Sequence, residues 1–176
     1  MITSKTKNVL QDAEGSFIVE YALVVPLLLY LVLGIVEFSV VMFGQVVLQS
    51  ATLAAAREGS TGCGGTGNPS CVLATLQARA GGSAANGTGS LFNAANLGIC
   101  VQDYGNVPST TAWAPPTPPA CAAGATPATL GVGGDVVIYT ATYKWAVITP
   151  FLSKILGNGD GTFTLIGTAL VQNQPW

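Results

Sequence analysis

The feature that most constrains this chain is a continuous apolar run near its N-terminus, residues 17–36. As a helix, 20 apolar residues span the roughly 30 Å of hydrocarbon in a bilayer. Lys5 and Lys7 precede the run, and Arg57 is the first basic residue after it. Because basic residues gather on the cytoplasmic side of a membrane, we expect a single-pass anchor with a cytoplasmic N-terminus and most of its mass outside the cytoplasm. The exceptions within the run are Glu20, Tyr21, Tyr30 and Gly34.

The composition agrees with an anchor joined to a polar but uncharged outer part. Charged residues make up 8% of the 176 residues, whereas soluble domains carry about 25%. The net charge is −2 with no basic stretch, so we expect no nucleic-acid partner. The absence of histidine removes the commonest general base and the usual nitrogen ligand of zinc. We therefore expect no enzyme, no cofactor and no metal site, and we expect Asp103, Asp135 and Asp160 to be solvated.

The helical pattern continues beyond the apolar run. Residues 38–58 contain no proline and only Gly44 as a weak helix breaker, and Glu58-Gly59 is typical of a helix end. The sequence predicts one helix of about 40 residues, near 60 Å long at 1.5 Å per residue. Its second half should stand out of the membrane as a stalk and pack against the outer domain on one face.

The outer part carries strand character in its C-terminal region. β-branched and aromatic residues alternate over 136–145 and recur over 162–171, which favours an antiparallel pair packed on the stalk helix. Two strands alone are marginal, so we expect a third at 97–103. The predicted fold class is α+β, a long N-terminal transmembrane and stalk helix with a small periplasmic antiparallel sheet.

The remaining outer segments are predicted as short helices and loops. Residues 71–80 favour a short helix with Val72, Leu73 and Leu76 on one side, and residues 149–156 favour another that begins at Thr149-Pro150. Residues 157–161 are predicted to form a turn. Loops rich in Gly, Ser, Thr, Asn or Pro are predicted at 59–70, 81–90 and 105–129.

Four cysteines lie C-terminal to the apolar run, and none forms a C-x-x-C pair. An even number beyond a membrane indicates disulfides in an oxidising compartment. Three pairings are possible. We favour the two that close short loops, and buried free thiols are the alternative. The favoured pairs are Cys63 with Cys71 and Cys100 with Cys121.

The most informative motif straddles the start of the apolar run, from Gly15 to Tyr21. It resembles the processing site of prepilins of the type IVb, tight-adherence (Tad) class, which are cut after a glycine and carry Glu fifth and Tyr sixth in the mature chain. Counted from Ser16, Glu20 is fifth and Tyr21 is sixth.

The resemblance extends along the helix to the TadE-like family. Pro26 fills the place of that family's early proline, and Gly34 to Phe38, with Glu37, fills its Gly-Ile-x-Glu-Phe step. Residues 54–59 also resemble the family. Residues 135–171 do so more loosely, and the proline-rich, cysteine-bearing middle does not.

A carboxylate such as that of Glu20 is costly within a membrane, about 2.5–3.5 kcal/mol at the bilayer centre and less near its edge. Cleavage before Ser16 would create a free amine one helical turn away, in the same subunit or a neighbour, and pairing with it would set subunit register. The alternative is a Glu20 that reaches the headgroups and does nothing further.

Three more residues are candidates for the helix assembly surface. Glu37 lies 17 positions after Glu20, about 25 Å along a helix. It either marks the outer membrane interface or contacts another subunit's helix. Pro26 and Gly34 either favour packing in a subunit bundle or are a harmless kink and a lone glycine.

The resemblance implies a minor pilin or pseudopilin-like component of a Tad pilus, located in the bacterial inner membrane and, where it is incorporated, in a surface pilus. The expected partners are a prepilin peptidase, other Tad pilins and minor pilins, the inner-membrane assembly platform and the lipid bilayer. The expected divisions are a leader at 1–15, a transmembrane helix at 16–37, its periplasmic continuation at 38–59 and the outer domain at 60–176.

Two alternatives remain open. The chain is either incorporated into a filament or is a membrane-anchored scaffold of the platform that never polymerises. A secreted protein with a cleaved signal fits poorly, because the apolar run exceeds the usual 7–15 residues of a signal peptide.

Overall fold

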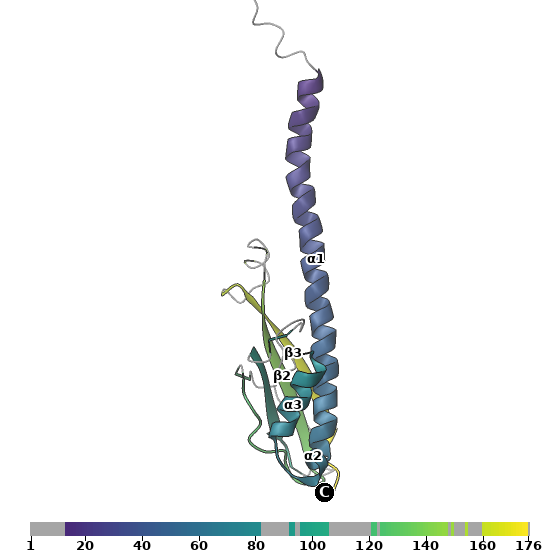
Figure 1. Cartoon of the computed structure of the whole chain (residues 1–176), viewed down its shortest axis with the longest axis vertical. Coiled ribbons are helices and arrows are strands. Elements are labelled where there is room, and N and C mark those ends of the chain that lie inside the picture. The colour runs from purple at the N-terminus through teal and green to yellow at the C-terminus, as the bar shows by residue number, and fades with distance from the viewer. Residues whose placement is uncertain are drawn as a thin grey trace, which may run out of the picture.

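The fold is seen in a computed structural model, which describes residues 13–81, 92–93, 96–105, 121–122, 124–147, 149, 154 and 160–175. One long helix runs the length of the molecule, and a small sheet and a short helix pack beside its C-terminal half (Figure 1). The C-terminus lies next to the far end of the long helix, where the Gln174 N–H donates to the Ser60 carbonyl at 2.9 Å. The expected α+β fold class is confirmed.

Helix α1, Ala13–Ser60, contains 48 residues and continues through Pro26. Its N-terminal half has exposed side chains on every side, as a membrane helix without neighbours would. Its C-terminal half buries one face against the outer domain through Leu48, Ala51, Ala55 and Ala56. The stalk that receives a domain on one face is therefore present, and alanine lets the sheet lie close to the helix axis.

The sheet has three antiparallel strands in the order β1-β2-β3. Their bounds are Leu97–Asp103, Val136–Ala146 and Thr162–Gln172. All three strands were expected, and β1 has the predicted bounds. One face of the sheet packs on α1 and α3, and its alternate residues form the core with the helices. The largest buried side chains of that face are Leu97, Ile99, Val137, Tyr139 and Leu165.

The predicted helix at 71–80 is α3, Ser70–Arg79, which buries Val72 and Leu76. The loop expected at 59–70 needs a correction, because it contains α2, Gly62–Gly65, a single irregular turn. Four glycines at 62, 64, 65 and 67 have positive φ there, so the chain reverses sharply from α1 into α3.

Two disulfides tie the domain together. Cys63 is bonded to Cys71, which joins the turn after α1 to α3, and Cys100 is bonded to Cys121, which joins β1 to the segment beside its edge. Along that edge, Ile99 N–H donates to the Ala125 carbonyl at 3.0 Å.

The expectation that Asp135 is solvated is wrong. Asp135 is buried, and its carboxylate accepts the Val132 N–H at 2.8 Å. Its own carbonyl accepts the Asn173 N–H at 2.8 Å. The aspartate therefore closes the turn that leads into β2, where the C-terminal segment covers it.

Several expectations lie wholly or mostly outside the described residues. These are the leader up to residue 12, the helix and turn at 149–161 apart from Thr149, Lys154, Asp160 and Gly161, and most of the loops at 81–90 and 105–129.

Candidate functional site

The predicted processing motif, residues 15–21, lies at the N-terminal end of α1. Gly15 and Ser16 are in its first turn, and the side chains of Glu20 and Tyr21 are exposed one turn later. The bond between Gly15 and Ser16 therefore lies in the first turn of α1 that the structure describes.

The Glu20 carboxylate is well placed to meet an amine at Ser16. The two residues are one turn apart, about 6 Å along the axis. Among the described residues no hydrogen bond or ion pair holds Glu20. Its exposure leaves it equally accessible to a neighbouring chain. Beside it, the rings of Phe17 and Tyr21 stack with centroids 5.9 Å apart.

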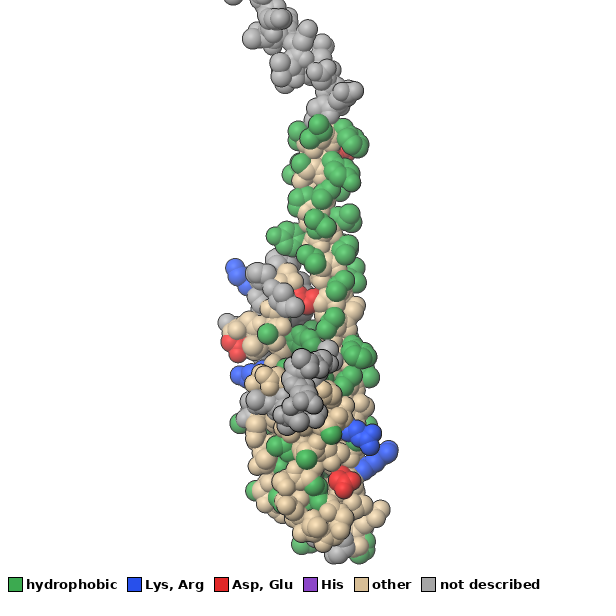
Figure 2. Space-filling model, in the orientation of Figure 1, with side chains coloured by type: hydrophobic (Ala, Val, Ile, Leu, Met, Phe, Trp, Pro, Cys, Tyr) green, Lys and Arg blue, Asp and Glu red, His purple; other side chains and the backbone are tan. Residues whose placement is uncertain are grey.

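The exposed half of α1 is apolar on all sides. It belongs to one helix, Phe17–Ser60, which is long and apolar enough to cross a membrane. Figure 2 shows hydrophobic side chains covering it from its N-terminal end to the start of the domain. Two apolar grooves follow its surface, and Pro26 lines one while Gly34 lines the other. Both residues thus lie where a partner helix would find a depression.

Glu37 is half-buried on the side of α1 that faces the outer domain. Its two carboxylate oxygens accept the N–H of Thr149 at 3.3 and 3.2 Å. In this structure Glu37 therefore holds the chain's own domain at the point where the apolar run ends.

Two glutamines extend this polar contact down the stalk. Gln45 donates to the Ile166 carbonyl at 2.7 Å, and Gln49 donates to the Thr168 carbonyl at 2.8 Å while accepting the Thr168 N–H at 3.2 Å. They therefore supply the hydrogen bonds that β3, as an edge strand, lacks on its outer side. The sequence reasoning missed this role. The sequence signal that could have predicted this role is the spacing of residues 37, 45 and 49. They are separated by multiples of four residues, which places them on one face of the helix.

Two glycines of α1 let the sheet approach closely. A methyl group at Gly44 would lie 3.3 Å from the Trp145 ring, and one at Gly59 would lie 2.7 and 2.8 Å from ring atoms Cζ and Cε1 of Tyr139. Tyr139 is fully buried, and its hydroxyl has no hydrogen-bond partner among the described residues. Burial, and after it the negative charge of Asp103, raises the pKa of Tyr139 from 10.0 to about 12.

The opposite face of the stalk remains apolar and exposed. Phe43 is 61% exposed, Val46 65% and Leu53 43%. Their spacing of three and seven residues keeps them on one side of the helix. This stripe continues the exposed apolar surface of residues 17–36 onto the stalk.

Comparison with known proteins agrees with the N-terminal features. Residues 15–57, about a quarter of the chain, match the family model of TadE-like proteins. The match begins at the glycine of the processing motif and ends in the last turns of α1, so it does not reach the sheet. No curated protein and no solved structure matches the chain. No group of three or more possible metal ligands occurs within the described part of the chain. Over residues 15–57, therefore, the long helix is similar to that of TadE-like proteins.

Proposed function

We propose that the chain is a pilin-like component of a Tad pilus, inserted in the bacterial inner membrane by α1 with its N-terminus in the cytoplasm. A prepilin peptidase cuts it between Gly15 and Ser16, and the mature chain then enters or primes a filament. The observation that carries the proposal is the pairing of the Gly15–Tyr21 motif with an apolar helix half whose side chains remain largely exposed among the described residues.

The mature N-terminus would provide a positive charge that can pair with Glu20. Cleavage gives Ser16 a cationic amine within one turn of the Glu20 carboxylate. In a low-dielectric environment each charge needs the other, because an unpaired charge there is costly. In a filament, a subunit whose Glu20 faces a neighbour's amine is held at one axial position, and other registers leave both charges unpaired.

The domain leaves a defined surface for neighbours. It occupies the face of the stalk that carries Glu37, Gln45 and Gln49. The stripe of Phe43, Val46 and Leu53 and the grooves at Pro26 and Gly34 remain open. Helices of other pilins or minor pilins would pack there through shape, since lipid and helix surfaces are equally apolar. The chain itself is then a substrate of the peptidase and a structural subunit, with no catalytic role.

The processing step is tested by mass spectrometry of the N-terminus after extraction from membranes. We expect a mature chain that starts at Ser16 in cells with an active prepilin peptidase and at Met1 without it. Gly15→Leu should block the cut, because a large side chain replaces the glycine at the scissile bond. Glu14→Gln, next to it in the leader, is the control and should be cut normally. A chain that starts at Met1 in peptidase-positive cells would refute processing.

The filament role is tested by shearing surface fibres and assaying them for the chain. Glu20→Gln should be cut but lost from the fibres, whereas Glu58→Gln, an exposed carboxylate at the far end of α1, should be retained. Normal incorporation of Glu20→Gln would rule out the register role. If the wild-type chain is cut but never found in fibres, the platform-scaffold alternative is correct.

A further inference from the structure

The height of the outer domain relative to the bilayer follows from α1. If residues 17–36 fill the hydrocarbon layer, the helix leaves it at Glu37. A bilayer of about 40–45 Å with 30 Å of hydrocarbon has a headgroup layer of roughly 5–7 Å on each side. At 1.5 Å per residue this layer covers about three to five residues of α1, starting at Glu37.

The end of the β2–β3 hairpin lies at this level. Thr149 follows β2 and is hydrogen-bonded to Glu37. Trp145, near the end of β2, lies against Gly44, which is seven residues or about 10 Å further from the membrane. Figure 1 shows this end of the two strands pointing along α1 toward its exposed half. The hairpin end therefore reaches the headgroup layer, and the rest of the sheet lies beyond it.

At the hairpin end, the acidic side chains are hydrogen-bonded within the protein, whereas the basic side chains are exposed to solvent. Both carboxylates there are engaged by the protein. The Asp160 carboxylate accepts the Thr162 hydroxyl and N–H at 2.6 and 2.9 Å, and Glu37 accepts the Thr149 N–H. Hydrogen bonds from Thr162 also lower the pKa of Asp160.

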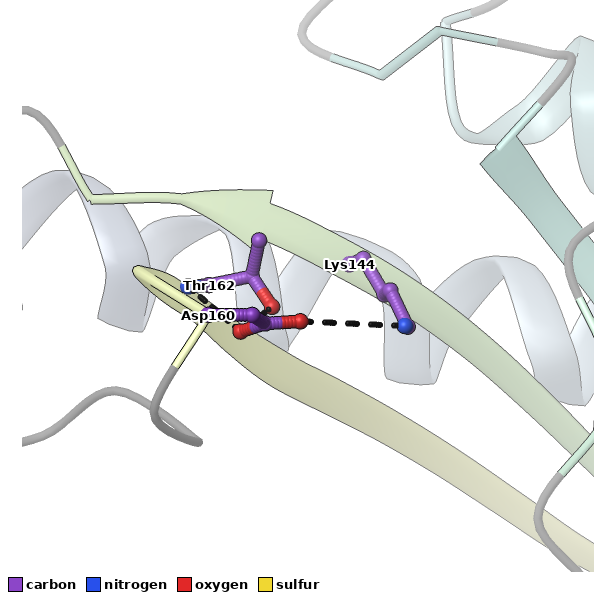
Figure 3. Close-up of polar contacts among 3 residues, drawn as sticks. All are labelled: Lys144, Asp160 and Thr162. Atoms are coloured by element: carbon purple, nitrogen blue, oxygen red, sulfur yellow. Dashed lines mark hydrogen bonds and ion pairs between the residues drawn. The ribbon is translucent and has the colours of Figure 1, made fainter.

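The two lysines of the hairpin end are left exposed. Lys144 is 63% exposed on its side chain, and its Nζ is 3.9 Å from Asp160, as Figure 3 shows. An exposed pair at that distance holds a lysine only weakly. Lys154 lies in the connection between β2 and β3 and is exposed. Arg57 and Arg79, in contrast, are in the last turns of α1 and α3. Figure 2 accordingly shows basic side chains in two separate places, one of them at the membrane-proximal end of the domain.

We propose that this membrane-proximal tip, defined as residues 144–147, Thr149, Lys154 and residues 160–162, rests in the headgroup layer of the bilayer and binds phospholipid phosphates through Lys144 and Lys154. By the same rise per residue, Trp145 lies beside Gly44, roughly 3–5 Å beyond the outer edge of this layer. The inference rests on the proposed membrane span.

Such a contact would give the subunit a defined orientation before assembly. The domain is fixed to α1 at Glu37, Gln45 and Gln49, so a tip bound to headgroups limits both the tilt of α1 and its depth. Before assembly, all subunits in the membrane would then hold Glu20 at the same depth in the bilayer. Extraction into a filament requires these lipid contacts to break.

The test uses the full chain in vesicles of phosphatidylcholine with phosphatidylglycerol. The chain has three tryptophans, so Trp113→Phe with Trp176→Phe leaves Trp145 as the single reporter. We expect lipids brominated near the headgroup to quench its emission. As a matched control, Trp145→Phe is added and Tyr104→Trp places the reporter beside the other end of β2, where no quenching is expected.

The lysines are tested in the same system. One lysine near an anionic surface favours contact about fivefold, so Lys144→Gln with Lys154→Gln should lower the ratio of docked to undocked tips roughly 25-fold. Arg57→Gln with Arg79→Gln is the control and should change nothing. Flotation with the vesicles reports the span separately. A chain that does not float refutes the membrane anchor, and a chain that floats while Trp145 stays unquenched, or is quenched equally in the lysine variant, overturns the tip proposal.

Discussion

At Gly59, α1 approaches Tyr139 of β2 so closely that a Cβ would overlap the ring, and Gly59→Ala tests whether this approach sets the position of the sheet. The added methyl group would lie 2.7 Å from Cζ and 2.8 Å from Cε1 of Tyr139, both far inside van der Waals contact. Tyr139 is fully buried between the helix and its own sheet, so its ring has no free space into which to move.

The size of the effect follows from two opposing contributions. Forcing a methyl group into a packed core costs about 1–3 kcal/mol. Replacing glycine by alanine inside a helix returns up to about 1 kcal/mol, and less here because α1 ends at Ser60. We expect a net loss of about 1–2 kcal/mol. For a domain of this size that corresponds to a fall in the melting temperature of about 4 °C per kcal/mol.

Tyr139→Phe provides the coupled measurement. The buried Tyr139 hydroxyl has no partner among the described residues, so its removal should raise stability by about 1 kcal/mol. Because the hydroxyl is also the atom nearest to the added methyl group, Gly59→Ala should cost less in the Tyr139→Phe background than in the wild type. Residues in contact typically couple by about 0.5–3 kcal/mol.

The assay is thermal unfolding in detergent, followed by near-ultraviolet circular dichroism. The control is Glu58→Ala, which changes the same helix turn at an exposed position. If Gly59→Ala is as stable as the wild type, or if its cost is the same with and without the Tyr139→Phe substitution, the close approach does not limit the packing and the reasoning is wrong.

Three further outcomes are expected. The pKa of Tyr139 is raised from 10.0 to about 12. The stability that this shift contributes is therefore fully present below pH 10, and the free energy of unfolding falls by about 2–3 kcal/mol as the pH rises to 12. Tyr139→Phe should remove this loss, which alkaline unfolding curves would measure. Gln49→Met removes both hydrogen bonds to Thr168 and should lower stability in urea by about 1–3 kcal/mol, and an unchanged urea midpoint would contradict the edge role. Replacing Cys100 and Cys121 by serine opens a loop with a sequence separation of 21 and should cost about 3 kcal/mol in the same urea assay.

The architecture was largely predictable from the sequence because its signals are local. Twenty apolar residues define a span without reference to the rest of the chain, and the strand pattern of β2 and β3 repeats with a clear period of two. The existence of a third strand was predicted because a two-stranded sheet is marginally stable. The residues at 59–70 predicted a loop but not α2, the single irregular turn in which Cys63 has a positive φ.

The contacts of the polar residues were not predictable, because each depends on a partner far away in the sequence. Glu37 was placed at a membrane interface or against another subunit, and the structure brings Thr149 to it. Asp135 was expected in solvent because aspartate usually lies there. Its burial depends on the C-terminal segment that folds over it at Asn173.

The way the sheet edges are covered bears on how subunits can associate. An open edge strand would favour pairing with another chain. Here Gln45 and Gln49 occupy the outer side of β3, while Gly124 and Ala125 pair with part of β1. The two glutamines therefore disfavour the addition of another strand at Ile166 and Thr168 of β3. The large exposed apolar surface of the described chain is the side of α1 that the domain leaves open, and the proposed association through helices would use this surface.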